Sequence, residues 1–331
     1  MDRRTDIDRA KGFAIVLVVF GHIAARHVPA GVLWYPPLHR AIYAFHMPFF
    51  FYLSGMVSWL AGHATTPPEG WPALAAARAR RLLVPFALMG GLIVLGKIVV
   101  ARFMIVDNPP TGLVSGLIDL VWTPGHSPAY SLWYLFVLFV LSLLAPALLH
   151  ALRGRVVLLL PAFAALEFIP LPWTLYLAVI ARYGLFYALG LCAGALGESW
   201  IGWIDRRCWP LLAVFCAGFV LIAAFGAHFP FAVRLLTLGP IAMPALHALL
   251  RFPCLSSDRI LMALGRYSLM IYLFNTIFIG LAKGVLLSFA AWSNRDFIPL
   301  AAILMASGLF GPILLKCTLF RAIPVLDRMT R

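Results

Sequence analysis

Two ionisable side chains lie eleven positions apart in the first apolar stretch of the chain. Lys11 stands near its start and His22 near its end. Eleven residues make about three turns of an α-helix, so both side chains are expected on one stripe, roughly 16 Å apart along the axis. An imidazole within a membrane span is costly, and such residues mark functional sites by default. The spacing predicts one helix with a cation near its cytoplasmic end and an acid/base group deeper in.

A second histidine belongs to the motif Phe-His-Met-Pro, which begins at Phe45 and continues to Ser54 and Gly55. We expect His46 about one turn into the second span from the outer side, and His22 past the middle of the first. The two imidazoles are therefore expected to approach each other, an arrangement that suits proton transfer near neutral pH. The structural alternatives are a histidine hydrogen-bonded between helices at position 22 and a helix-start interface residue at position 46.

One acidic residue, Glu167, falls deep within a predicted span. It lies about 18 Å from the inner face at the helical rise, close to the expected depth of His22. Glu167 is therefore a candidate partner that orients His22 or accepts its proton. The alternative is that Pro170 and Pro172 place this carboxylate near the outer surface, facing water.

Two arginines, Arg78 and Arg80, open the third predicted span on the inner side. Their spacing is expected to put two guanidiniums near one another at a helix start, where free backbone N–H groups also favour anions. This pattern predicts a site for the phosphates of a cytoplasmic ligand. For the adjacent Arg81 we favour simple anchoring by the positive-inside rule.

The composition places these residues in a membrane. The chain is 63% apolar and 11% charged, with a mean hydropathy of +0.95, whereas soluble domains are about 45–50% apolar. We predict an all-α polytopic membrane bundle of about ten transmembrane helices, forming a single transmembrane domain over 1–331 with no appended soluble domain. Apolar runs of spanning length lie near 12–27, 42–62, 82–102, 129–149, 155–173, 183–199, 209–228, 233–250, 267–290 and 297–319.

The distribution of basic residues predicts the orientation of these ten spans in the membrane. Of the 26 lysines and arginines, eighteen fall in segments on the same side as the N-terminus, six on the other side and two within spans. Such an excess follows the positive-inside rule and predicts that both termini are cytoplasmic. The net charge of +14 is thus explained by topology and does not indicate nucleic acid. The five cysteines all fall in predicted spans or inner loops, so we expect no structural disulfides. They show no paired metal-ligand spacing such as C-x-x-C, so we expect no metal site.

Several sequence blocks together resemble the membrane acyltransferase-three family, whose members acylate hydroxyl groups of cell-envelope glycans and related molecules. The blocks follow the family's order and extend through most of the chain. They are Asp8 to His22, Phe45 to Gly55, Arg78 to Pro85, Leu132 to Leu135, and Leu264 to Ser268 continuing to Leu273.

The resemblance implies functional roles for Lys11, His22, Arg78 and Arg80. Two positions depart from the family pattern. Lys11 stands where arginine is common, so a compact ammonium group replaces a guanidinium that could bind an anion through two N–H donors. Asn275 stands where many members have histidine, which puts an acid/base role there in doubt.

The expected activity is that of an integral membrane O-acyltransferase, an enzyme transferring groups other than aminoacyl groups. The resemblance implies acyl-CoA, in our expectation acetyl-CoA, as a co-substrate rather than a bound cofactor. The expected acceptor is a glycan or lipid-linked sugar, and the expected location is the inner (plasma) membrane. His22 would act as general base or carry the acyl group transiently. The alternative from another class is a proton-coupled transporter or flippase, and a structural membrane scaffold is the third.

The charge pattern makes a topological prediction. A reporter fused after Arg331 should report the cytoplasm, and one inserted within 107–128 should report the opposite side, because an odd number of predicted spans, seven, lies between the two positions. Alkaline phosphatase and fluorescent-protein fusions measure this directly. If both reporters were found on one side of the membrane, the predicted arrangement of spans would be refuted.

Overall fold

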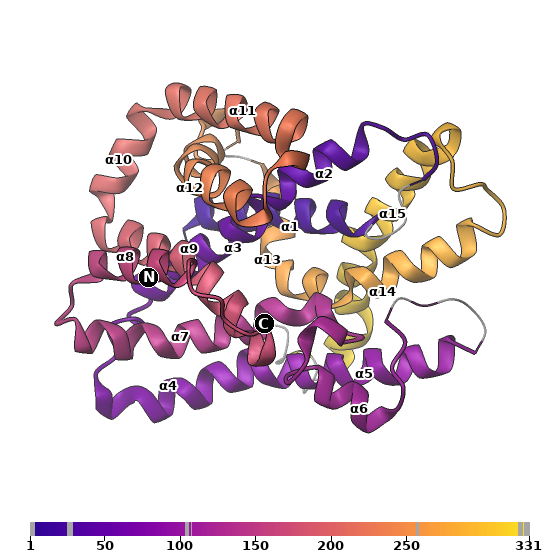
Figure 1. The fold of residues 1–331 in the computed structure, drawn as a ribbon, viewed down its shortest axis with the longest axis horizontal. Coiled ribbons are helices and arrows are strands. Elements are labelled where there is room, and N and C mark those ends of the chain that lie inside the picture. Colours follow the sequence, from indigo (N-terminus) through magenta and orange to yellow (C-terminus); the bar gives the residue numbers. More distant parts are fainter. Residues whose placement is uncertain are drawn as a thin grey trace. The chain divides into compact units, whose positions relative to one another are not determined.

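The computed structural model describes residues 4–24, 29–102, 106, 108–255, 258–323 and 327. Within these residues the regular elements are helices, and one isolated bridge joins Ala30 to Ser293. The chain divides into two compact units, and Figure 1 traces its helices in sequence order. The terminal unit comprises Met1–Leu53 and Leu196–Met329 with Arg331, and the central unit comprises Ser54–Ala195 with Thr330.

Each unit is built of helices alone in its described parts. The terminal unit holds α1 (Thr5–His22), α2 (Tyr35–Tyr43), the first half of α3 (His46–Leu60), α10 (Glu198–Arg206), α11 (Cys208–Phe225), α12 (Phe231–Leu250), α13 (Arg259–Arg266), α14 (Ser268–Leu286) and α15 (Asn294–Leu315). The central unit holds the second half of α3, α4 (Trp71–Arg78), α5 (Val84–Val100), α6 (Leu113–Asp119), α7 (Trp133–Ala151), α8 (Leu159–Leu166) and α9 (Leu177–Leu196).

Helices long and apolar enough to cross a membrane confirm the predicted polytopic helical fold. Over the described part of the chain there are eight of them. They cover Tyr35–Leu60, Pro68–Val100, Tyr130–Ala151, Thr174–Leu196, Cys208–His228, Phe231–Leu250, Ser268–Leu286 and Asn294–Phe320. Each coincides with one of the ten predicted spans, and the remaining two predicted spans coincide with α1 and α8.

These two helices differ from the prediction for separate physical reasons. α1 is long enough, but its first half carries Asp6, Asp8, Arg9 and Lys11, too many charges for a uniformly apolar span. The predicted fifth span, 155–173, is wrong as a full-length helix. Its helical part covers only Val156–Leu166, and the prolines that follow cannot continue a helix. Residues 25–27, at the end of the first predicted span, lie outside the described residues.

The outward faces of the long helices carry the apolar surface that lipid requires. On α5, Leu88, Leu92, Leu95 and Val99 are each 50–55% exposed. Their spacing of four, three and four residues places them on one stripe. A contiguous exposed stripe of this kind is unusual on a soluble monomer and suits a helix bathed in hydrocarbon.

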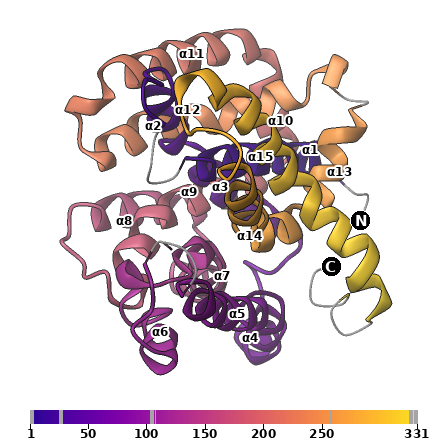
Figure 2. The same ribbon diagram turned by 90° about the vertical axis from the view of Figure 1, so that its right-hand side faces the viewer.

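Helix α1 is held by an unusually close approach to α13. A β-carbon on Gly265 would overlap the backbone carbonyl of Asp8, and one on Gly12 would overlap that of Leu261. The two helices therefore meet backbone to backbone, which only small residues allow in a membrane bundle. α14 and α15 also pack closely (Figure 2), but here a side chain lies between them: Gly311 packs against the ring of Phe278. Ser307 Oγ donates to the Phe278 carbonyl at 3.1 Å.

The first turn of α1 is fixed by a buried ion network. The Asp6 carboxylate accepts hydrogen bonds from Arg251 Nη1 at 3.0 Å, Arg4 Nη2 at 3.1 Å and His247 Nε2 at 3.5 Å. Burial by itself would raise the pKa of Asp6, but the hydrogen bonds from His247 and Arg4 outweigh it and hold the pKa well below its usual range. The carboxylate therefore stays charged at all ordinary pH values.

The hydrogen bonds of His247 set its tautomer. Trp200 Nε1 donates to the Tyr52 hydroxyl at 2.8 Å, and that hydroxyl contacts His247 Nδ1 at 2.8 Å. Because the tyrosine oxygen accepts from the indole, its own proton points to Nδ1, and the imidazole proton on Nε2 points to Asp6. Every polar group in this chain of contacts is satisfied, which identifies it as a structural anchor.

The contact between α1 and α13 yields a stability prediction. Gly265→Ala should destabilise the protein by about 1–3 kcal/mol, because the added methyl forces the two backbones apart. Gly280→Ala is the matched control, since nothing lies within 4 Å of a β-carbon there and alanine favours a helix interior by up to about 1 kcal/mol. Thermal unfolding in detergent measures both variants. A Gly265→Ala protein as stable as the control would contradict the close approach.

Candidate functional site

His22 is the last residue of α1, on the same unbroken helix as Lys11. The expected three-turn separation on one stripe is therefore realised. His22 is half-buried, and in the described structure its imidazole has no hydrogen-bond partner. It lies within electrostatic range of His39 and His46. An imidazole without a committed partner, beside two others, is free to exchange a proton with a substrate.

His46, which lies within electrostatic range of His22, is linked to His39 by a row of three rings. His39 on α2 stacks on Tyr43, with ring centroids 3.9 Å apart, and Tyr43 contacts His46 at 4.6 Å. His46 is buried at the start of α3, and its Nδ1 donates to the Ile42 carbonyl at 2.9 Å. Its Nε2 therefore keeps the lone pair, so His46 presents a neutral acceptor.

The same row of rings is tied to the end of α1. His39 Nε2 and the Tyr43 hydroxyl both donate to the Gly21 carbonyl, each at 3.3 Å. A β-carbon on Gly21 would lie 2.6 Å from the Tyr43 ring, so glycine is needed for this approach. The α2 aromatics are thus held directly against the residue that precedes His22.

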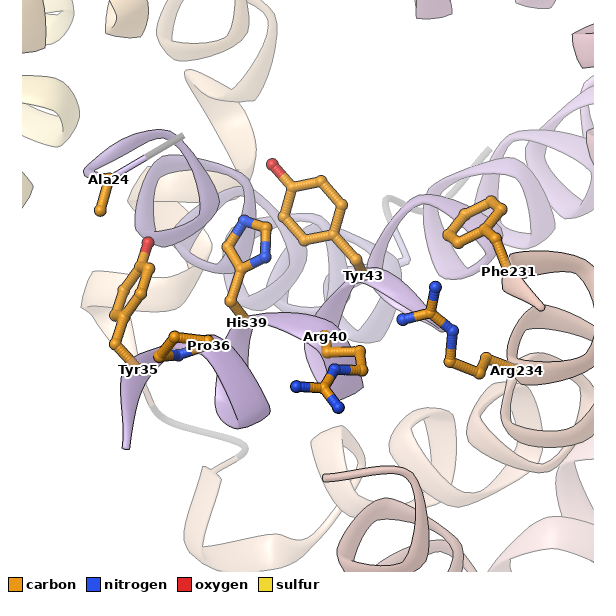
Figure 3. Close-up of a pocket in the computed structure, with 8 residues that line it drawn as sticks. All are labelled: Ala24, Tyr35, Pro36, His39, Arg40, Tyr43, Phe231 and Arg234. Carbon is orange, nitrogen blue, oxygen red and sulfur yellow. The ribbon is translucent and has the colours of Figure 1, made fainter. Parts of the chain in front are cut away.

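A cavity of about 350 Å³ opens beside this row (Figure 3). One wall is formed by Tyr35, His39 and Tyr43, and the guanidiniums of Arg40 and Arg234 lie on the other side. Ala24, two residues after His22, also lines it. Its volume falls in the range of small-molecule sites, about 300–1,000 Å³.

The central unit contains a second polar cluster, around Arg78. Arg78 Nη2 donates to His63 Nδ1 at 2.7 Å, so that nitrogen is an acceptor and the ring is neutral. Burial and the positive charges of Arg78 and Arg81 lower the pKa of His63, which keeps it neutral at pH 7. Arg78 also lies within electrostatic range of Tyr187 and Tyr134.

One polar atom of this cluster, Arg78 Nε, is buried without a hydrogen-bond partner in the described residues. Buried polar atoms are nearly always paired. The unpaired donor of Arg78 therefore suits a ligand that supplies an acceptor oxygen.

The expected helix start at the arginine pair is wrong. The helical segment begins at Pro68 and runs through a π-helical turn, Ala79–Leu83, into α5. Arg78 and Arg80 consequently lie inside a continuous helix, where no backbone N–H is free. Residues two apart also point to different faces: Arg80 is exposed, and its Nε reaches back to the Ala76 carbonyl at 3.3 Å.

Glu167 is committed to a partner within the central unit. Arg182 Nε donates to its carboxylate at 3.2 Å, and the glutamate side chain is only 7% exposed. Glu167 directly follows α8, which ends at Leu166, so the deep mid-span placement is not realised. Its role toward His22 stays a prediction.

Asn275 is buried in α14, and its Nδ2 donates to the carbonyls of Ile271 and Tyr272, each at 2.9 Å. An amide turned onto its own helix cannot transfer a proton. This position therefore offers no acid/base group.

Sequence reasoning missed His39, Tyr43 and the two arginines of the cavity. A signal was present for the first two: Tyr35, His39 and Tyr43 recur every fourth residue and so share one face of α2. No comparable signal joined Arg40 to Arg234, which are almost 200 positions apart.

The blocks that carry the family resemblance pack against one another. Ser54 Oγ and the Tyr134 hydroxyl are 2.7 Å apart, and a β-carbon on Gly55 would overlap the Tyr187 carbonyl. In the terminal unit, Gly12 of the first block meets Gly265 of the last. The conformations of the motifs are thus mutually dependent.

Comparisons with known proteins identify relatives of this chain. Two curated relatives are both called Nodulation protein NolL. The protein of Mesorhizobium japonicum is 28% identical over 227 residues, which is 68% of this chain and 55% of that protein. The protein of Sinorhizobium fredii is 27% identical over 300 residues, 82% of this chain and 77% of its own length. The chain thus spans about half the length of the first relative. The solved structures give no match.

The family comparison covers nearly the whole chain. The model of the acyltransferase domain matches residues 4–317, a range that contains His22, His46, Arg78 and Arg80. This match shows that the chain belongs to the acyltransferase-three family of membrane proteins.

Proposed function

We propose that this chain is an integral membrane O-acyltransferase that moves an acetyl group from cytoplasmic acetyl-CoA to a hydroxyl of an envelope or exported glycan. The observation that carries the proposal is His22. Its imidazole has no hydrogen-bond partner in the described structure, and it lies within electrostatic range of His39 and His46. The family membership supports acyl transfer as the reaction class.

His22 would serve the reaction by one of two routes. As a general base it takes the proton of the acceptor hydroxyl, whose oxygen then attacks the thioester carbonyl. The C–O bond forms, the C–S bond breaks, and the departing thiolate takes up the proton. As a nucleophile, its unprotonated nitrogen attacks the thioester carbonyl, the C–S bond breaks, and the thiolate leaves with the imidazole proton. The acceptor hydroxyl then attacks the acyl carbon, the C–N bond breaks, and the hydroxyl proton returns to the imidazole. Both routes need an unprotonated imidazole at position 22.

His46 would act as a relay partner. Its Nδ1 is committed to the Ile42 carbonyl, so only Nε2 can receive a proton. A buried neutral acceptor near His22 provides a temporary place for the hydroxyl proton. The rings of His39 and Tyr43, which contact Gly21 and His46, would hold the imidazoles of His22 and His46 in position.

The donor phosphates would be held by the basic residues that the resemblance identifies. Arg78 offers a buried Nε with no partner among the described residues, Arg80 an exposed guanidinium, and Lys11 a charge on the helix of His22. Charge-assisted contacts from arginine to phosphate are among the strongest polar interactions in proteins. In this proposal the chain resides in the inner membrane, with the donor on the cytoplasmic side.

The proposal predicts that His22→Gln abolishes transfer. Glutamine keeps a polar group of similar reach but cannot take a proton, and losing a general base costs about 10²–10⁴-fold in rate. The measurements are acetyl-CoA consumption by the purified protein and acyl incorporation into the native acceptor. His126→Gln is the matched control, because His126 is an exposed residue at the end of a short 3-10 helix. Near-normal incorporation by His22→Gln would reject both routes and favour the proton-coupled transporter.

A second prediction concerns the donor. Arg78→Gln or Arg80→Gln should remove a contact worth about 1.5–3 kcal/mol, so donor affinity should fall about tenfold or more. The Michaelis constant for acetyl-CoA should rise more than the turnover number falls. Arg81→Gln should have a smaller effect. Equal, small effects at all three positions would leave only membrane anchoring for these arginines.

A further inference from the structure

The cavity beside α2 combines aromatic rings and two cations, and nothing in the proposed transfer step uses the cations. Arg40 and Arg234 are both half-buried. Arg40 lies near the start of the helical segment Tyr35–Leu60, and Arg234 near the start of Phe231–Leu250. The charge pattern of the sequence places both at the outer side.

The two guanidinium side chains are close together. A β-carbon built on Gly226 would lie 3.2 Å from Arg40 Cδ and 3.3 Å from Arg234 Cδ. Because these distances share one endpoint, the two Cδ atoms are at most their sum, 6.5 Å, apart. The two charges repel each other across this gap. Holding like charges together in a partly desolvated site is costly unless an anion compensates them.

No anion of the protein fills this role in the described structure. Neither arginine forms an ion pair with a described carboxylate. Arg234 Nε is buried without a hydrogen-bond partner, and its guanidinium lies 5.6 Å from the centre of the Phe231 ring. The donors of both arginines therefore remain available to a ligand in the cavity.

We propose that Arg40 and Arg234 form an oxyanion site that holds a phosphate or carboxylate of the acyl acceptor. Arginine binds both groups through paired N–H donors. The opposite wall offers the rings of Tyr35 and Tyr43 to an apolar sugar face. That the ligand is the acceptor rests on the proposed function; that the cavity binds an anion does not.

The position of the cavity agrees with a role in placing the acceptor. Its wall residues His39 and Tyr43 are hydrogen-bonded to the Gly21 carbonyl, and Ala24 lines the same cavity. These contacts lie on both sides of His22 in sequence. An acceptor anchored by its charged group would thus present its hydroxyl beside the end of α1.

The binding test uses the purified full chain in detergent, with inorganic pyrophosphate and glucuronate as separate probes. With coenzyme A in excess to fill the proposed donor site, titration calorimetry should detect one bound probe in the wild type. Arg40→Gln and Arg234→Gln should each weaken that binding at least about tenfold, and Arg40→Lys should weaken it less, because the charge remains. Binding of pyrophosphate alone would identify a phosphate, and binding of glucuronate alone an acidic sugar.

Two controls make the outcome decisive. Arg295→Gln removes an exposed arginine on the same predicted side and should leave binding unchanged. His22→Gln should also bind normally, so a failure of the catalytic proposal would be distinguishable from a failure of this one. Binding of neither probe, or equal affinity in the wild type and both cavity variants, would overturn the oxyanion site. Size-exclusion profiles identical to the wild type confirm that the variants are folded.

Discussion

The backbone contact between α1 and α13 is the constraint on which the arrangement of the terminal unit depends. Gly12 and Gly265 let the two helices meet without intervening side chains, and such an approach leaves little freedom to slide or rotate. His22 lies ten residues after Gly12 on the same helix, about 15 Å farther along. The network at Asp6 fixes the other end of that helix. The side chain that we propose as the catalytic base is thereby carried on a helix held at its start and middle.

The buried polar groups of this protein are of two kinds, those with hydrogen-bond partners and those without. The difference matters because the protein interior has a low dielectric constant. The chain from Trp200 through Tyr52 and His247 to Asp6 satisfies every donor and acceptor, so it has nothing left to offer a ligand. By contrast, Arg78 Nε and Arg234 Nε are buried without partners in the described structure. An unsatisfied buried donor costs about 1–3 kcal/mol, a cost that a bound anion removes. The distribution of unsatisfied groups thus marks where substrates are expected.

The family blocks serve two purposes that the sequence pattern does not separate. Helices approach closely at Gly12, Gly55 and Gly265, and the hydroxyls of Ser54 and Tyr134 form a hydrogen bond. These contacts serve the packing of the helices. Among the described residues His22 makes no such contact, and we propose a chemical role for it. A variant in the first group should lose fold, whereas a variant at His22 should lose only activity. This distinction guides the choice of inactive but folded proteins for substrate-binding work.

The sequence by itself determined the elements that depend on local rules. Apolar runs of spanning length had to form helices, because hydrocarbon cannot satisfy free backbone groups, and helical periodicity placed Lys11 and His22 on one stripe. Local chemistry also fixed the short length of α8, because the prolines that follow it cannot continue a helix. Only the tertiary structure decided that Arg40 faces Arg234, and that Arg78 turns to His63 while Arg80 turns away. These arrangements arise from packing between segments distant in sequence, or from helix phase around a π-helical turn, which no local pattern encodes.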